Sequence, residues 1–373
     1  MGMPSCELAA LLMLSRIKGL GVTGARLLYR QFGCARDIFL HTDQIKEIIP
    51  GVSESLIQAL HDPWYDSFLQ RELDFIDRHG INHVVYGDSN YPSRLLDCRD
   101  APLLLFTLGN VDLNARHTVG IVGTRKATEY GRRICREFVR DLKVLCPDAV
   151  VISGLAVGID IESQRTAMEV GLSTYGVLGH GLDTIYPACH RNDARQMLGY
   201  GGLITEYATG TPPLRPNFVQ RDRIIAGLSD AVIVVECAAK SGSLVTAEIA
   251  YSYNRECFAF PGCVGDPYSV GCNDLIRDNR AALITNANDF VAAMGWDTPE
   301  HRSAQGVQKD LFPELSELER SIVDRISRNA RGVHVNAIIV ELNIPFPELT
   351  AIMLSLELKG IAKIGPGSMC VLM

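Results

Sequence analysis

The sequence predicts an α/β protein built on an extended, doubly wound and mostly parallel sheet. Short apolar runs of strand character end in loops of small residues, and each loop opens a segment with helical spacing. Residues 118–122 run into Gly123-Thr124-Arg125, and residues 149–152 run into Ser153 and Gly154. A third run, residues 231–235, leads to Lys240-Ser241-Gly242-Ser243. This alternation of strand, small-residue loop and helix is typical of parallel sheets with crossover helices.

The three loops predict a binding site for a polyanion. Loops that follow parallel strands gather at one edge of the sheet, where backbone N–H groups and helix N-termini attract phosphate. Arg125 and Lys126 follow the first strand of the three and place positive charge in its loop. A guanidinium can donate two parallel hydrogen bonds to a phosphate, so we expect Arg125 to be the main contact.

Composition sets the broad class of the protein. The chain has 373 residues, of which 47% are hydrophobic, and this fraction supports well-buried domains. No apolar run is long enough for a bilayer span and no signal-like segment opens the chain, so we expect a cytoplasmic protein without a membrane partner. The eleven cysteines form no Cys-x-x-Cys pair, which predicts reduced thiols and no metal site.

The net charge of −7 excludes a uniformly basic surface, but basic residues cluster locally. Residues 125–143 include seven basic residues and only three acidic ones. One predicted helix face carries Arg132, Arg136, Arg140 and Lys143. We interpret the far end of this face, with Arg140 and Lys143, as a solvated outer surface.

Residues 1–80 are predicted to form a helical domain. Apolar spacing before and after Gly19-Leu20-Gly21-Val22-Thr23, and again around residues 50–53, resembles a helix-hairpin-helix or SAM-like arrangement. The first glycine turn carries no lysine or arginine. A structural or protein-contact role is therefore favoured over phosphate binding.

Residues 81–296 are predicted to hold the whole sheet. Nine runs have strand character: residues 82–86, 103–108, 118–122, 149–153, 173–178, 203–206, 231–235, 257–260 and 282–284.

Residues 297–313 lose periodicity and are interpreted as a linker. Residues 314–373 then show three helical segments and a terminal glycine hairpin, which predict a winged helix. Its expected recognition helix, residues 347–359, carries Glu348 and Glu357 against Lys359. This charge suits a protein contact better than DNA.

The chain contains neither a phosphate-binding Gly-x-x-x-x-Gly-Lys-Ser/Thr loop nor an intact Gly-x-Gly-x-x-Gly after a strand. ATP hydrolysis and dinucleotide redox chemistry are therefore poorly supported. No histidine has a recognisable nucleophile and orienting group around it, so His180, at a strand end, is expected to be a surface or lightly buried residue without a catalytic role.

An ordered set of motifs nevertheless resembles one family, the DNA-processing protein A (DprA, Smf) family. The motifs are Gly123-Thr124-Arg125, residues 153–160 (Ser-Gly-Leu-Ala-Val-Gly-Ile-Asp), residues 181–187, residues 221–229 (Arg-Asp-Arg-Ile-Ile-Ala-Gly-Leu-Ser), residues 241–247, Pro261-Gly262 and residues 271–276. Tyr91-Pro92 extends the resemblance towards the N-terminus.

The resemblance implies an extended Rossmann-like domain that binds single-stranded DNA during natural transformation. It further implies that the protein protects incoming strands, helps to load the RecA recombinase and forms a homodimer through the Rossmann-like domain. It implies neither an enzyme nor a cofactor. The residues expected at the DNA are Gly123, Thr124, Arg125, Lys126, Ser153, Gly154, Arg221, Arg223, Lys240, Ser241, Gly242 and Ser243.

Two positions depart from the family pattern. Val157 stands where the family usually has a basic residue, and Asp222 replaces the asparagine of an Arg-Asn-Arg motif. Both changes remove contacts or positive charge. Affinity is then expected to be lower, unless Lys126, Arg165 or Arg191 compensates.

Several alternatives stay open on the sequence alone. Arg221 and Arg223 could form ion pairs with Asp222 or Asp230 instead of contacting DNA. Base stacking could come from an aromatic side chain near the loops, for which the candidates are Tyr130, Tyr186, Tyr207 and Phe218. Two other functions compete with DNA binding. The protein could be a protein adaptor whose phosphate-binding edge is vestigial, or residues 241–248 could belong to a nucleoside-monophosphate phosphoribohydrolase. Leu244 stands where the enzyme would need a glycine.

Overall fold

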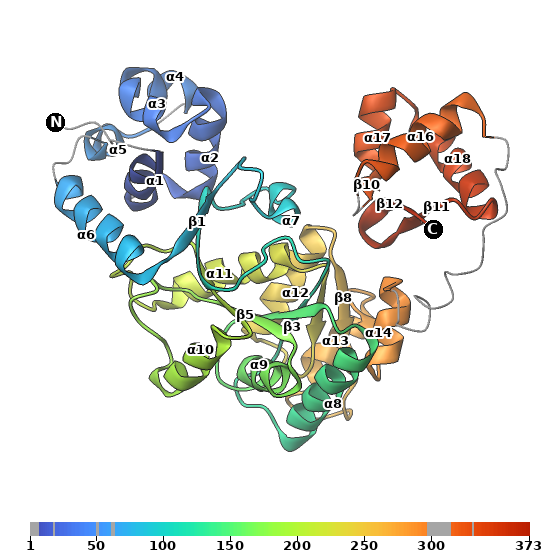
Figure 1. Ribbon diagram of the computed structural model, residues 1–373. Helices are drawn as coiled ribbons and strands as arrows, with labels where there is room; N and C mark the ends of the chain where they lie inside the picture. Colours follow the sequence, from blue (N-terminus) through green and yellow to red (C-terminus); the bar gives the residue numbers. More distant parts are fainter. Residues whose placement is uncertain (1–6, 18, 50–51, 61–63, 297–314, 330–331) are drawn as a thin grey trace.

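A nine-stranded sheet forms the centre of the described chain (Figure 1). The computed structural model describes residues 7–17, 19–49, 52–60, 64–296, 315–329 and 332–373. The strand order is β1-β2-β6-β5-β4-β3-β7-β8-β9. The strands are β1 (Asn82–Val85), β2 (Leu104–Gly109), β3 (His117–Val122), β4 (Ala149–Ser153), β5 (Ser173–Val177), β6 (Gly201–Thr205), β7 (Ala231–Val234), β8 (Glu256–Ala259) and β9 (Ala282–Leu283).

The sheet reverses its winding at β3. Successive strands β3 to β6 are parallel and build outward on one side, whereas β7 pairs with the other side of β3 and is followed by β8 and β9, also parallel. Only β2 runs antiparallel to its two neighbours, β1 and β6. The sheet edge beyond the carboxyl ends of β3 and β7 is therefore a topological switch point, the place where open α/β sheets bind ligands.

Helices cover both faces of the sheet (Figure 1). Alternate residues of each strand supply two cores, so that Val232 and Val234 face one helix layer while Ile233 faces the other. α11 (Arg215–Leu228) and α12 (Gly242–Ser252) lie on the first face, with α7 (Ser93–Leu96) and α13 (Val270–Arg277). α8 (Glu129–Leu145), α9 (Ile159–Val170) and α14 (Ala287–Met294) lie on the second. The short α10 (Arg191–Met197) packs beside β5 and β6.

β6 begins two residues earlier than predicted because of its glycines. Gly201 and Gly202 both pair with β5, and Gly202 also pairs with β2 on the other side. A Cβ atom on Gly202 would lie 2.1 Å from the Leu108 carbonyl oxygen. Glycine is therefore required for close strand approach here, whereas its low strand propensity argued against a strand.

The N-terminal segment is helical as predicted. Its helices are α1 (Glu7–Arg16), α2 (Gly21–Phe32), α3 (Ala35–Leu40), α4 (Ile45–Ile48), α5 (Glu54–Ala59) and α6 (Trp64–His79). Six consecutive residues of α1, from 9 to 14, are buried, so this helix is the centre of the small bundle. Gly19 and Gly21 have positive φ and make the turn between α1 and α2.

The C-terminal segment is a winged helix. It consists of α16 (Glu317–Ser327), β10 (Val333–His334), α17 (Val335–Leu342), α18 (Phe346–Leu358), β11 (Ala362–Gly365) and β12 (Met369–Leu372), the three strands forming a separate sheet in the order β10-β12-β11. The predicted fold class is thus confirmed. The predicted linker, residues 297–313, lies outside the described residues, and the domain limits stay predictions.

The first helix of the winged helix is held by Glu319. Ser316 and Glu319 form a capping box, and the Glu319 carboxylate also accepts bonds from the Ser355 hydroxyl at 2.8 Å and Lys359 at 2.7 Å. The bond from Lys359 above all, and then those from Ser316 and Ser355, lower the pKa of Glu319 to about 2. One side chain therefore ties α16 to α18.

We expect Glu319→Gln to destabilise the winged helix by about 1–2 kcal/mol, because the capping box and the ion pair to Lys359 both weaken. The stabilisation is fully present above the ordinary glutamate pKa of about 4.3 and is lost as the pH falls towards 2. Hydrogen exchange of residues 315–329 in the full chain at neutral pH is the measurement, with Glu317→Gln as control. Equal exchange in the two variants would contradict this assignment.

Within the described residues, no single helix has the length and apolarity needed to cross a membrane. One bent pair, α17 with α18, meets the length and composition criteria together, with 114° between the two helices.

Candidate nucleic-acid interface

The loop after β3, residues 123–128, is held rigidly at the switch point. The Thr124 N–H donates to the Glu236 carbonyl at 2.6 Å, and the Thr124 carbonyl accepts from the Ile159 N–H at 3.3 Å. A Cβ on Gly123 would lie 2.6 Å from the Ile159 side chain, and one on Gly158 would lie 2.1 Å from the Thr124 carbonyl oxygen. Two glycines thus let the loops after β3 and β4 pack backbone against backbone.

This loop presents Arg125 and Lys126 to solvent. Both side chains are exposed, whereas Thr124 is buried and its hydroxyl accepts from the Lys126 N–H at 3.1 Å. The Arg125 guanidinium lies 5.9 Å from the centre of the Phe218 ring. The predicted main phosphate contact is therefore an exposed cation on a rigid loop, placed beside an aromatic ring.

Ser153 and Gly154, in contrast, have internal roles. The Ser153 hydroxyl is fully buried and donates to the Ile121 carbonyl at 2.6 Å. The Gly154 N–H donates to Asp160 Oδ2 at 3.2 Å. The expectation that these two residues offer donors to a phosphate is corrected, because both donors already have partners inside the protein.

Gly154 instead makes room for Arg221. A Cβ at position 154 would lie 2.1 Å from Arg221 Nη1. The Arg221 side chain is buried, donates to the Val177 carbonyl at 2.6 Å, and pairs with Asp222 at 3.1 Å. It also lies 5.8 Å from the Phe218 ring centre. Arg221 therefore forms the floor of the site next to Arg125, and the ion pair with Asp222 that the sequence left open is present.

Arg223 does not add exposed charge to this edge. Its guanidinium is buried, pairs with Glu206 at 2.5 Å and donates to the Asp100 carbonyl at 2.5 Å. The predicted role of Arg223 is corrected, because these two partners occupy it inside the fold. The alternative partner Asp230 is itself bonded to Arg94 at 2.5 Å.

The loop after β7 brings the N-terminus of α12 to the same edge. Lys240 and Gly242 are exposed, Ser241 is half-buried, and Ser243 is buried with its hydroxyl 2.5 Å from that of Ser241. No hydrogen bond from the N–H groups of Gly242 and Ser243 occurs among the described residues. These donors and the helix dipole can therefore receive an anion, and Lys240 adds charge beside them.

Two of the four aromatic candidates form a surface next to Arg125. The rings of Tyr186 and Phe218 lie 5.6 Å apart, and Tyr186 is 47% exposed. The Tyr130 hydroxyl donates to the Pro261 carbonyl at 2.5 Å, and the Tyr207 hydroxyl faces Gln220 at 3.2 Å. Tyr186 and Phe218 are thus the pair positioned to stack on a base.

Sequence reasoning missed Asp160, which lies under the site. Burial raises the pKa of Asp160 to about 6, opposed by Arg221 and increased by Asp222. Burial also raises the pKa of Asp222, opposed by Arg221 and Arg125. Asp160 was visible in the sequence only as the last residue of a motif, and its charged neighbours come from other segments.

His180 is more deeply buried than predicted. It is 1% exposed, its Nδ1 lies 2.9 Å from the Gly181 carbonyl oxygen, and burial lowers its pKa. It follows β5, between Gly179 and Gly181. A neutral structural histidine fits this environment.

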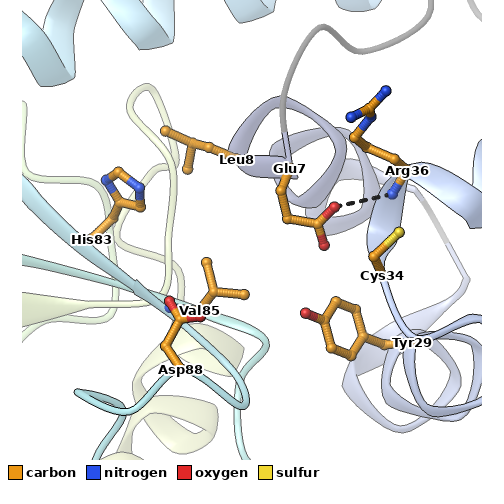
Figure 2. Close-up of a pocket in the computed structure, with 8 residues that line it drawn as sticks. All are labelled: Glu7, Leu8, Tyr29, Cys34, Arg36, His83, Val85 and Asp88. Atoms are coloured by element: carbon orange, nitrogen blue, oxygen red, sulfur yellow. Dashed lines mark hydrogen bonds between the residues drawn. The ribbon is translucent and has the colours of Figure 1, made fainter.

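A separate hollow of about 430 Å³ lies between the N-terminal bundle and β1 (Figure 2). Figure 2 shows Glu7 directed at the backbone of Arg36, and its carboxylate accepts from the N–H groups of Ala35 at 2.6 Å and Arg36 at 3.2 Å. Glu7 therefore stabilises the N-terminus of α3. Among the described residues no group of three His, Cys, Asp or Glu side chains could hold a metal ion, here or elsewhere.

Comparison with known proteins agrees with this architecture. A sequence model described as "DNA recombination-mediator protein A" matches residues 82–295, and one described as "DprA winged helix domain" matches residues 309–368. Protein Smf of Escherichia coli K12 is 36% identical over 296 residues, which cover 77% of this chain and 76% of that protein. DNA processing protein DprA of Streptococcus pneumoniae is 39% identical over 206 residues, 55% of this chain and 71% of that protein.

Solved structures give the same result. The crystal structure of S. pneumoniae DprA is similar with a TM-score of 0.67 at 31% identity, covering 77% of this chain and 96% of that one. A structure of DNA processing protein A from Helicobacter pylori, described for its single-stranded DNA binding mode, is similar with a TM-score of 0.52 at 29% identity, covering 57% and 94%. From the motifs, the fold and these matches together, the chain belongs to the DprA/Smf family.

Proposed function

We propose that this protein binds single-stranded DNA at the switch-point edge of its sheet. The observation that carries the proposal is the position of Arg125. It is exposed on a loop that backbone hydrogen bonds hold in place, and it lies next to the Phe218 and Tyr186 rings. The open N-terminus of α12 and Lys240 extend the same edge. Cations and N–H donors contact phosphates while the rings stack on unpaired bases, a combination that suits a single strand without sequence preference.

In the cell, this binding would serve natural transformation, by protecting incoming single strands and helping to load the RecA recombinase. Family membership supports this role, as does the structure of the H. pylori relative described for single-stranded DNA binding. We further propose a cytoplasmic homodimer that associates through the Rossmann-like domain. The protein would act by binding, without catalysing a reaction on DNA and without a cofactor.

The winged helix is proposed to contact protein. Its recognition helix α18 carries Glu348 and Glu357, and Lys359 after it is paired with Glu319. Phe346 and Leu358 are exposed on the same helix. Acidic and apolar side chains in this position disfavour a DNA phosphate contact.

The phosphoribohydrolase alternative receives no support. Glu248, the acid it requires, pairs with Arg280 at 3.1 Å on the exposed side of α12. Leu244 occupies the position where that chemistry needs a glycine.

Titration of a fluorescently labelled oligothymidine, with an unlabelled single strand or duplex as competitor, tests the proposal. We expect the single strand to compete more strongly than a duplex of the same length. Equal competition would contradict the stacking surface, and the absence of binding would favour the protein-adaptor alternative.

Val157→Lys is expected to strengthen DNA binding severalfold. Val157 is 39% exposed at the loop before α9, so a lysine there can reach solvent without displacing packed atoms. The added charge then attracts phosphate within a Debye length of about 10 Å at moderate salt. Melting temperature and oligonucleotide Kd are measured on the same sample. Unchanged affinity with unchanged stability would place the DNA path away from this loop.

A further inference from the structure

One buried and one mostly buried carboxylate lie beneath the proposed phosphate site. Asp160 belongs to the first turn of α9 and is 8% exposed, and Asp222 belongs to α11 with 15% of its side chain exposed. Asp160 accepts the Gly154 N–H at 3.2 Å, and Asp222 lies 3.1 Å from Arg221 Nε. The two acids come from helices on opposite faces of the sheet, and both interact with the Arg221 guanidinium.

The charges around this pair nearly balance. Arg221 and Arg125 lower the pKa of both carboxyl groups, and the Asp222 carboxylate raises the pKa of Asp160. From α12, the Thr246 side chain faces Asp222. His180, which faces Arg221, is kept neutral by burial, and Glu236 is directed at Thr128 at 2.7 Å. With both acids ionised, the two arginines are matched by two negative charges before any phosphate arrives.

A phosphate at Arg125 would add a third negative group to this cluster. The energetic conflict is relieved when one carboxyl takes up a proton, because the protonated acid no longer competes for the guanidinium groups. Burial already raises the pKa of Asp160 to about 6 and raises that of Asp222, so this protonation is accessible near neutral pH. Because the Asp222 carboxylate raises the pKa of Asp160, ionisation of one acid opposes ionisation of the other.

We propose that binding of a DNA phosphate at Arg125 is coupled to uptake of a proton by the Asp160–Asp222 pair, which makes Asp222 a determinant of DNA affinity. The inference rests on the proposed single-stranded DNA binding. The resemblance implied an uncharged asparagine at position 222, and the proposal gives a consequence to the aspartate present there. By thermodynamic reciprocity, DNA raises the proton affinity of the pair by the same factor as the proton raises DNA affinity.

The test is the oligothymidine Kd at constant ionic strength from about pH 5.5 to about pH 8, a range that brackets the titration of the pair. Wild type is expected to bind tighter as the pH falls, by at most about tenfold per pH unit for one coupled proton. Asp222→Asn should bind tighter than wild type at about pH 8 and show a flatter pH profile. Glu169→Gln, which removes a charge at an exposed side chain paired with Arg140 at 3.6 Å, is the matched control and should keep the wild-type profile.

A second measurement needs no variant. Calorimetric titration of wild type with oligothymidine in two buffers of different ionisation enthalpy, near pH 6.5, gives the number of protons taken up on binding. We expect net uptake of a fraction of a proton. Zero uptake or release, or a wild-type pH profile in a folded Asp222→Asn variant that still binds DNA, would overturn the coupling while leaving the proposed function intact. Failure of wild type to bind oligothymidine at any pH would overturn the proposed function itself.

Discussion

Arg125→Ala is expected to weaken single-stranded DNA binding by about 10- to 100-fold. Loss of one charge-assisted hydrogen-bond contact costs about 1.5–3 kcal/mol, and about 1.4 kcal/mol corresponds to a factor of ten. The side chain is exposed and its loop is fixed by backbone bonds at Thr124, so the substitution should leave the fold intact. The measurement is the Kd by fluorescence anisotropy, together with the melting temperature.

Arg140→Ala is the matched control. Arg140 is also an arginine of the basic segment, but it lies three turns along α8, is 53% exposed and has only a 3.6 Å pair with Glu169. We expect less than a twofold effect on binding, from the general loss of one positive charge. If the two folded variants bind DNA alike, the site is wrongly placed.

Gly154→Ala is expected to destabilise the protein strongly. The new Cβ would lie 2.1 Å from Nη1 and 2.6 Å from Cζ of Arg221. Arg221 would have to leave its bond to the Val177 carbonyl and its pair with Asp222, at a cost of about 3–5 kcal/mol for breaking a buried ion pair. Urea unfolding of the full chain measures the loss.

Gly242→Ala serves as the control for Gly154→Ala. No atom lies within 4 Å of a Cβ built at position 242, and its φ is not positive. Stability should therefore be unchanged or slightly higher, since alanine restricts the unfolded chain. DNA affinity should nevertheless fall if a phosphate approaches the α12 N–H groups closely. Equal stability of the two variants would contradict the role given to Gly154.

The positions of the strands could be predicted because most strands are short apolar runs followed by loops that contain glycine or serine. β3, β4 and β7 are buried along their whole length, and each begins and ends within one residue of its predicted limits. The exception was β6, where Gly201 and Gly202 are needed for strand contact and cannot be distinguished from a turn by composition.

The site was predictable only in part, because its exposed and buried residues share the same motifs. Arg125 and Lys126 follow directly from their place in a loop after a strand. Arg223, in contrast, takes its partners Glu206 and Asp100 from segments far away in the sequence, and no local pattern pairs them. Likewise, the motif glycine at position 154 indicates close approach, but the sequence does not say that the approaching group is Arg221.

The salt dependence of DNA binding in wild type and Arg125→Ala tests the central claim most directly. The logarithm of the binding constant for a single strand falls with the logarithm of salt concentration by about 0.7 for each phosphate neutralised. Titrations between about 50 and about 200 mM salt should therefore give a clearly negative slope for wild type and a slope shallower by about 0.7 for Arg125→Ala. Identical slopes for the two proteins, or a flat dependence in wild type, would contradict a phosphate bound by Arg125 at the switch-point edge.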